Sequence, residues 1–202
     1  MRVYLVRHGQ TEWNSTGRAQ GHTDIPLDAD GKAQADMLER RFAHLKIDVL
    51  SSDLKRAADT ARAICARPVL DPRLRERGFG EWEGIDFHDI HKRASASGLS
   101  LFEFTPPGGE SFHDVWDRVK PVTRELFERR EDLVVVSHGG TCAILLAQLL
   151  QGSYDTSRSF RFGNTAVTTL ERRPEGQFLM TQYNDMSHLA VPARQGDLGG
   201  ST

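Results

Sequence analysis

Long apolar runs and an excess of charge of one sign are both absent from this chain of 202 residues. No stretch approaches the roughly 20 apolar residues of a membrane-spanning helix, and the first apolar run ends at Arg7, too early for a secretory signal. Lysine and arginine number 26 against 28 aspartate and glutamate, so the formal net charge is -2. We therefore expect neither a nucleic-acid-binding nor a membrane-bound protein, and an anionic ligand would need a local cluster of cations.

Cysteines and metal-binding patterns are also sparse. The 2 cysteines, Cys65 and Cys142, fall in predicted helices and are interpreted as small buried apolar residues. Such sparse use is typical of a reducing compartment, and we expect a cytoplasmic protein. The 8 histidines include no His-x-x-x-His pair, and no Cys-x-x-Cys, Walker or dinucleotide motif is present, so we expect no catalytic metal and no cofactor.

What the chain does contain is a short apolar strand that ends in reactive side chains. Val3 to Val6 is rich in β-branched and aromatic residues and predicts a buried strand. Arg7 and His8 follow at its carboxyl end, and Gly9 allows a sharp turn. Ligands of open α/β sheets bind at this end of the strands, so the pair stands where chemistry is expected. The alternative is a plain surface pair at the start of a loop.

A second stretch, far along the chain, repeats this plan. Residues 133–136 are aliphatic and predict a central strand, His138 follows, and an apolar helix begins near Thr141 after two glycines. Two strands of one sheet would thus each bring a histidine to the same edge. This arrangement favours a functional site over two unrelated structural histidines.

The rest of the chain alternates helical and extended patterns. Helices are expected over 32–46, from a cap at Ser52 or Asp53 to about Ala66, over 86–93, and from Ser111 along a face that Pro121 should kink or split. Strands are expected at 47–50 and 68–70, with an antiparallel hairpin at 166–170 and 177–183. Residues 94–98 and 106–109 read as a loop and a turn. This alternation predicts a mostly parallel sheet covered on both faces.

The stretch Leu5-Val-Arg-His-Gly-Gln-Thr-Glu-Trp-Asn14 resembles the signature of the histidine phosphatase superfamily, in the branch of phosphoglycerate mutases and small-molecule phosphatases. The resemblance extends to about Leu189. It implies an α/β three-layer sandwich, with a mostly parallel central sheet, one antiparallel strand and helices on both faces. It also implies a single domain over residues 1–194. The tail, 195–202, has little to bury and is expected to be disordered.

The resemblance also implies catalytic roles. His8 would attack phosphorus and form a phosphohistidine, which requires a neutral imidazole. Arg7 and Arg56 would lower its pKa and bind the phosphate, although Arg56 without the resemblance would be interpreted as a solvated helix residue. His138 would donate a hydrogen bond to the phosphoryl oxygens.

The proton donor implied by the resemblance is Glu76. It lies in Leu74-Arg-Glu-Arg-Gly-Phe-Gly80, which resembles the family's Leu-x-Glu-x-x-x-Gly stretch. Glu81 and Glu83 lie close by and are interpreted as part of a polar loop around a buried Trp82. Glu76 would protonate the leaving oxygen and then activate water.

Further residues are expected around the phosphate. Asn14 and the backbone amide of Gly139 are candidates for the same pocket, and Gln20 and Gly21 match a loop that often faces the substrate in the family. No metal ligand is expected. The full phosphate-binding set is Arg7, Asn14, Gln20, Gly21, Arg56, His138 and Gly139.

These inferences predict a metal-independent phosphatase that hydrolyses small phosphate monoesters, with a small-molecule ester as its partner. A 2,3-bisphosphoglycerate-dependent phosphoglycerate mutase is the main alternative, and a non-catalytic phospho-ligand binder is another. Mutases of the family tend to carry a longer basic insertion before the position of Pro106, and this segment is short here. The oligomeric state is left open, with a homodimer as one option.

Three phenylalanines in the same irregular segment bear on the substrate. Phe87, Phe102 and Phe104 would form an apolar wall and favour aromatic esters if they line the site. Packing within a core is the alternative interpretation of these residues.

Overall fold

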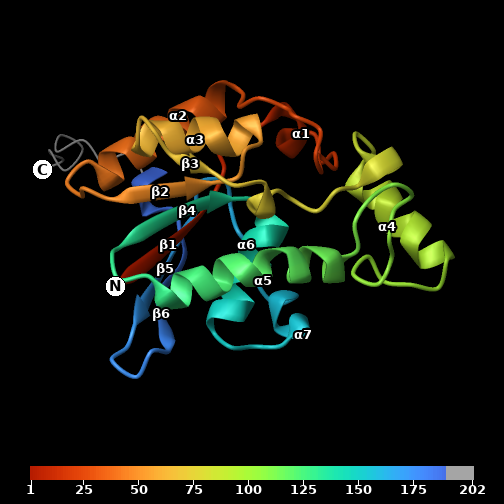
Figure 1. Cartoon of the computed structure of the whole chain (residues 1–202). Helices are drawn as coiled ribbons and strands as arrows, with labels where there is room; N and C mark the ends of the chain where they lie inside the picture. The colour runs from red at the N-terminus through yellow and green to blue at the C-terminus, as the bar shows by residue number, and fades with distance from the viewer. Residues whose placement is uncertain (190–202) are drawn as a thin grey trace, which may run out of the picture.

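The computed structural model describes residues 1–189 and shows one six-stranded sheet with helices on both faces (Figure 1). The predicted tail, 195–202, lies outside the described residues. The strands are β1 (Arg2–Arg7), β2 (Asp48–Ser51), β3 (Val69–Leu70), β4 (Leu133–Ser137), β5 (Val167–Arg172) and β6 (Phe178–Asp185), in the order β3-β2-β4-β1-β5-β6. The first four of that order pair in parallel, and β5 runs antiparallel to β1 and to β6. The predicted fold, with its single antiparallel strand, is confirmed.

Seven α-helices connect these strands within the described residues. They are α1 (Glu12–Ser15), α2 (Ala29–Phe42), α3 (Lys55–Ile64), α4 (Phe87–Ala96), α5 (Phe112–Glu128), α6 (Gly139–Leu149) and α7 (Tyr154–Ser157). Two of the longer helices begin at a residue whose side chain caps the helix. The Asp28 carboxylate caps α2, and Ser111 forms a reciprocal capping box with Asp114 at the start of α5.

The two faces of the sheet bury two different apolar clusters. Val3 and Leu5 of β1 pack with residues of α5 and α6, whereas Tyr4 and Val6 pack with residues of α2 and α3. This division follows from the two-residue period of a strand, which sends neighbouring side chains to opposite faces. Strand β4 is buried along its whole length, as expected of a central strand.

Two local predictions are wrong and a third is wrong in part. Helix α5 is continuous through Pro121, so the predicted split is wrong, and the kink that was the other predicted outcome stays a prediction. Val115 and Leu126 anchor α5 to the core on both sides of the proline. Helix α4 runs on to Ala96, because Ala94 is buried beside Ile90 on one face. Helix α3 begins at Lys55 without a side-chain cap, and its first amide donates to Asp24 at 2.7 Å.

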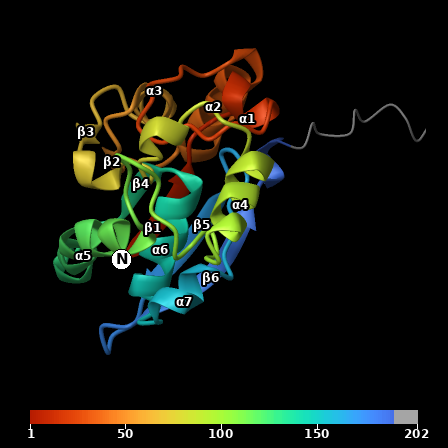
Figure 2. The same ribbon diagram turned by 90° about the vertical axis from the view of Figure 1, so that its right-hand side faces the viewer.

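Residues 79–104, here called the cap segment, lie beyond the carboxyl ends of the parallel strands and have a small apolar cluster separate from those of the sheet. In Figure 1 its helix α4 stands apart from the sheet, and in Figure 2, which faces that side of the molecule, α4 lies toward the viewer. Phe79, Trp82 and Ile90 pack with Ala19 in a separate small cluster. Phe104 stacks on Trp82, with ring centroids 4.6 Å apart. Of the two interpretations left open for Phe104, packing within a core is the one that the structure supports, because Phe104 stacks on Trp82 and does not line the cavity of the site.

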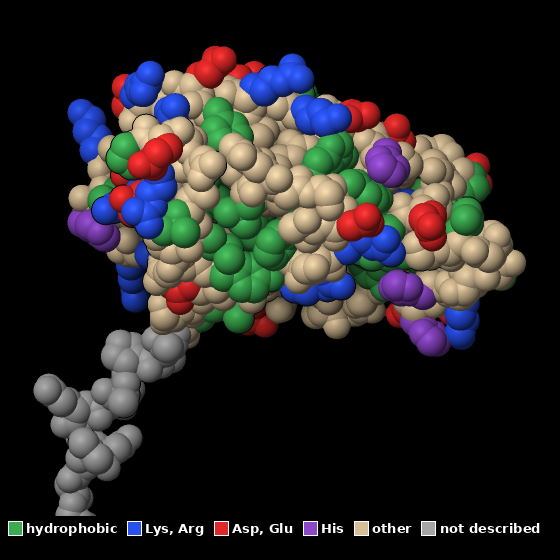
Figure 3. Space-filling view, turned by 90° about the horizontal axis from the view of Figure 1, so that it is seen from below, with side chains coloured by type: hydrophobic (Ala, Val, Ile, Leu, Met, Phe, Trp, Pro, Cys, Tyr) green, Lys and Arg blue, Asp and Glu red, His purple; other side chains and the backbone are tan. Residues whose placement is uncertain are grey.

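Surface features agree with the balanced composition. On the face shown in Figure 3, acidic and basic side chains are interspersed rather than gathered by sign. Over the part of the chain that the structure describes, no helix is both long and apolar enough to cross a bilayer.

Candidate active site

A cavity of about 280 Å³ opens beside the carboxyl ends of β1 and β4. Its inner wall brings together segments that are far apart in sequence, from the end of β1, the start of α3, the loop before the cap segment and the start of α6. Eight of the predicted site residues line it: Arg7, His8, Asn14, Gln20, Gly21, Arg56, Glu76 and Gly139. The ninth, His138, lies just behind this wall, with its ring centroid 5.1 Å from that of His8.

The hydrogen bond of His8 fixes which ring nitrogen can react. Its Nδ1 lies 2.6 Å from the carbonyl oxygen of Gly9, which can only accept, so Nδ1 carries the proton. In the neutral ring, Nε2 is then left with a free electron pair. His8 is almost fully buried, and the neighbouring Gly9 amide donates to the Thr60 hydroxyl at 3.0 Å, which holds the turn in place.

Burial and charge together keep both histidines of the site neutral. Burial, reinforced by the guanidinium groups of Arg56 and Arg7, holds the pKa of His8 well below its usual value. The pKa of His138 is lowered for the same reasons, with burial again the largest cause. A neutral imidazole is the form that can attack phosphorus.

The two arginines reach the cavity in different ways. Arg7 Nη1 donates to the Phe162 carbonyl at 2.7 Å, whereas its buried Nε has no hydrogen-bond partner among the described residues. Arg56 is 1% exposed and donates to the carbonyls of Gly21 (2.8 Å) and Thr23 (3.0 Å). Burial lowers the pKa of Arg56 to about 10, so this residue stays cationic at neutral pH. Its alternative interpretation as a solvated residue is wrong.

His138 is held between Arg56 and Ser52. The Arg56 Nε donates to His138 Nδ1 at 3.2 Å, and His138 Nε2 lies 2.9 Å from the Ser52 hydroxyl. Because a guanidinium can only donate, the ring proton sits on Nε2 and points to Ser52. His138 therefore orients Arg56 in this state, and it could donate through Nδ1 only after taking up a proton.

Three carboxylates that the sequence places close together have different surroundings. Glu76 lines the cavity at the amino terminus of α6 and accepts from the amides of Gly140 (3.1 Å) and Thr141 (3.2 Å). Glu83 instead accepts from the amides of His22 and Thr23, both at 2.8 Å, and so braces that loop. Glu81 is exposed and does not line the cavity. This geometry favours Glu76 as the acid.

The loop after α1 presents Gln20 and Gly21 to the cavity. Gly21 has a φ of +52°, and a Cβ there would lie 2.1 Å from the Glu83 carboxylate, so only glycine fits. The Gln20 side chain is buried, and its Oε1 has no hydrogen-bond partner among the described residues. The Gln20 Oε1 atom is therefore available to accept a hydrogen bond from a ligand in the cavity.

Two positioning residues were not predicted from the sequence. Asn164 Nδ2 donates to the His8 carbonyl at 3.0 Å and to Asn14 Oδ1 at 3.2 Å. Asn14 Oδ1 also accepts from the Thr11 amide, which turns the Asn14 NH₂ group away from these donors. Ser52, considered only as a helix cap, instead contacts His138. The stretch Gly163-Asn-Thr-Ala-Val-Thr also resembles the family, and this resemblance was the one signal that could have found Asn164.

We expect the ring signals of His8 and His138 in the phosphate-free protein to stay unchanged from pH 8 down through about 6.5, the pH at which an ordinary histidine titrates. A lowered pKa means that protonation occurs only at more acid pH, so both rings remain neutral over this range. Proton–carbon correlation spectra of the imidazole Cε1 groups would measure this. His22 is an internal control, because hydrogen bonding to Glu110 raises its pKa. A His8 signal that titrates near its ordinary value contradicts the neutral nucleophile.

Comparisons with known proteins agree with this geometry. Residues 3–185 match the family model of the histidine phosphatase superfamily (branch 1). A glucosyl-3-phosphoglycerate phosphatase of Mycolicibacterium vanbaalenii is 38% identical over 169 residues, which cover 74% of this chain and 74% of that protein. A probable phosphoglycerate mutase of Salmonella choleraesuis is 32% identical, covering 96% of this chain and 97% of that protein. The structure of a mycobacterial glucosyl-3-phosphoglycerate phosphatase complexed with VO3 superposes with a TM-score of 0.80 at 31% identity, covering 91% and 98% of the two chains.

Proposed function

This chain belongs to the histidine phosphatase superfamily, and we propose that it is a metal-independent phosphatase that hydrolyses small phosphate monoesters through a phosphohistidine. The observation that carries the proposal is the His8 ring, neutral and fixed by the Gly9 carbonyl, in a cavity lined by Arg7, Arg56 and Glu76. The partner is then a small-molecule ester. The sparse cysteines support a cytoplasmic location, and the oligomeric state stays open, with a homodimer as one option.

In the first step, the electron pair of His8 Nε2 attacks phosphorus while the bond from phosphorus to the ester oxygen breaks. Glu76 gives a proton to that leaving oxygen, so a neutral alcohol departs. In the second step, water attacks the phosphohistidine, Glu76 takes its proton, and the bond between phosphorus and nitrogen breaks. Inorganic phosphate leaves, and both His8 and Glu76 return to their starting protonation states.

The cations of the inner wall supply the charge stabilisation that phosphoryl transfer needs. The Nε of Arg7, which has no hydrogen-bond partner within residues 1–189, is a ready donor to a phosphoryl oxygen, and Arg56 brings a second buried positive charge. The amide of Gly139, at the amino terminus of the eleven-residue helix α6, adds the positive end of a helix dipole. His138 contributes by holding Arg56, and it becomes a donor to phosphate if the incoming dianion raises its pKa.

The test is phosphate release from p-nitrophenyl phosphate in excess EDTA, beside a coupled assay for isomerisation of 3-phosphoglycerate. We expect metal-independent release and no isomerisation. Isomerisation stimulated by 2,3-bisphosphoglycerate would instead make the protein a mutase. Loss of release on chelation, restored by a divalent cation, would contradict the metal-independent mechanism.

A further inference from the structure

The outer half of the cavity is lined by aromatic rings. Six of the chain's 10 phenylalanines face it, drawn from the cap segment, the start of α5 and the loop after α7. With one leucine they make what we call the phenylalanine wall: Phe79, Phe87, Leu101, Phe102, Phe112, Phe160 and Phe162. Phe79 and Phe162 are mostly buried in the apolar clusters and form the base of the wall. The other five side chains are partly exposed, so their apolar surface is presented to whatever enters.

The rings of this wall are held in place by one another and by a buried cation. Phe102 and Phe112 have centroids 4.6 Å apart, and Phe79 meets Phe87 edge to face at 5.6 Å. The Arg77 guanidinium lies 4.4 Å from the Phe112 ring centroid. Because the wall is ordered before a ligand arrives, little side-chain entropy is lost when one binds.

Two arginines beside this wall, Arg77 and Arg161, donate hydrogen bonds to backbone carbonyl oxygens of the protein. Arg77 donates to the carbonyls of Glu110 (2.7 Å), Leu101 (2.9 Å) and Phe104, and it thereby ties the cap segment to the start of α5. Arg161 Nη1 donates to two carbonyls of its own loop, both at 2.8 Å.

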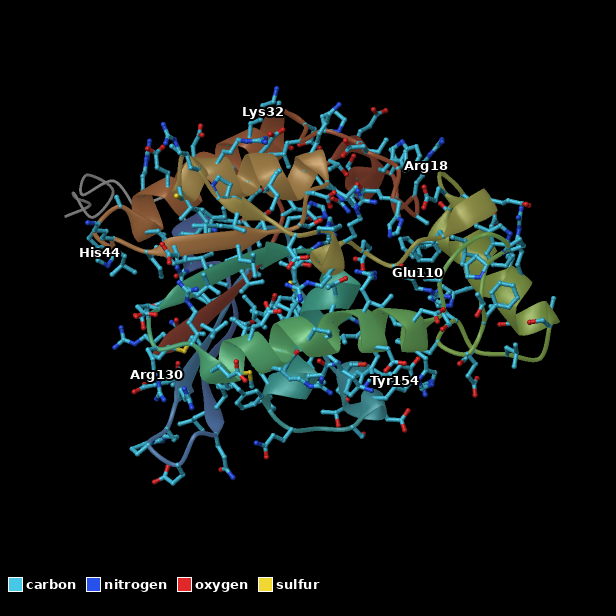
Figure 4. The ribbon with its side chains drawn as sticks, in the orientation of Figure 1. Arg18, Lys32, His44, Glu110, Arg130 and Tyr154 are labelled. Atoms are coloured by element: carbon cyan, nitrogen blue, oxygen red, sulfur yellow. The ribbon has the colours of Figure 1, made fainter. Side chains whose placement is uncertain are left out.

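Over the described residues, the remaining outer cation that lines the cavity is Arg18, which is exposed at the rim. Figure 4 labels it between α1 and α4, at the same end of the molecule as Glu110 and Tyr154. A second anionic group on a substrate would therefore meet two exposed guanidiniums, those of Arg18 and Arg161, and a largely apolar surface, where burying a charge is costly.

We propose that the preferred substrates are phosphate monoesters whose alcohol carries a bulky apolar or aromatic group, which docks on the phenylalanine wall. This inference rests on the proposed function for the phosphate end of the molecule. An aromatic group would pack against Phe87, Phe102 and Phe112 in stacked or edge-to-face contact. The cavity volume, about 280 Å³, lies near the lower end of ligand pockets and suits a compact ester.

Binding of non-hydrolysable phosphonates tests the wall without relying on turnover. We would compare 3-phenylpropylphosphonate, n-propylphosphonate and 3-carboxypropylphosphonate by titration calorimetry. Burial of one phenyl group should make the first ligand bind about 10- to 100-fold more tightly than the second. Equal affinities of these two ligands overturn the inference. Tightest binding of the carboxylate ligand also overturns it, in favour of a substrate with a second anion.

Matched variants locate the effect on the wall. Phe87→Ala and Phe102→Ala change partly exposed side chains, so the fold should tolerate them. Each should reduce the phenyl preference by about fivefold or more while leaving the affinity for n-propylphosphonate unchanged. Leu99→Ala is the control, since Leu99 is 42% exposed in the same segment and does not line the cavity. A preference that survives both phenylalanine variants contradicts the wall as the binding surface.

Turnover measured on the same preparations separates this inference from the proposed function. 2-Phenylethyl phosphate and ethyl phosphate have similar leaving groups, so a difference in kcat/KM reports the phenyl contact rather than the chemistry. Phenyl preference in binding without any turnover, including that of p-nitrophenyl phosphate, supports the wall and refutes the phosphatase. Turnover of all esters with no preference refutes the wall and leaves the phosphatase standing.

Discussion

His8→Ala should lower phosphate release from any monoester by about 10⁴-fold or more, because it removes the group that accepts the phosphoryl. The fold should persist, since the substitution deletes one hydrogen bond to the Gly9 carbonyl, a loss of about 1 kcal/mol. Steady-state release measured by a phosphate assay gives the activity, and thermal unfolding gives the stability. Activity that survives in the folded variant would sink the phosphohistidine mechanism.

Chemical trapping makes this first prediction specific to the covalent step. Rapid quenching of the wild-type protein with ³²P-labelled substrate should leave label that is stable to alkali and labile to acid, as expected of a phosphohistidine. His8→Ala should trap none. His44→Ala is the matched control, because His44 is exposed and lies at the opposite end of the molecule from Arg18 (Figure 4). Equal labelling of His8→Ala and wild type would place the phosphoryl group elsewhere.

The position of the site could be predicted from the sequence because two separate apolar strands each end in a histidine and a glycine, and parallel strands bring such ends to the same edge of a sheet. The strands that end in Arg7 and Ser137 are parallel neighbours, paired in register, so the residues that follow them meet at one edge. Each pattern needed only a short apolar run and an adjacent glycine. Arg56 and Glu76 were different, since nothing local separates them from solvated residues, and only the resemblance to the family indicated them.

The contacts that orient the catalytic side chains could not be predicted from the sequence, because they join residues that are far apart along the chain. The bond from His138 to Ser52 spans 86 positions, and that from Asn164 to the His8 carbonyl spans 156. Within the cap segment, the directions of neighbouring side chains could not be predicted from the sequence either. Phe102 faces the cavity whereas Phe104 stacks on Trp82, and the irregular chain between them has no period that would predict which side each takes.

Glu76→Gln should slow hydrolysis of an alkyl ester by about 10²–10⁴-fold, the usual worth of a positioned acid or base. A glutamine keeps an oxygen to accept from the Gly140 or Thr141 amide, so the local structure should survive. It cannot supply the proton that an alkoxide needs as it leaves. Because p-nitrophenolate leaves without a proton, the first step should be nearly normal with p-nitrophenyl phosphate.

The kinetic trace of this variant therefore discriminates between a chemical and a structural role for Glu76. We expect a burst of about one equivalent of p-nitrophenol per site, followed by slow turnover, because water then lacks its general base. Glu81→Gln is the control for an exposed carboxylate of the same segment and should behave as wild type. Glu83→Gln should weaken phosphate binding instead, since Glu83 braces the loop whose Gly21 and Thr23 carbonyls hold Arg56. If Glu76→Gln loses the same factor on alkyl and nitrophenyl esters, with no burst, Glu76 only supports the structure, and the proton must come from another group.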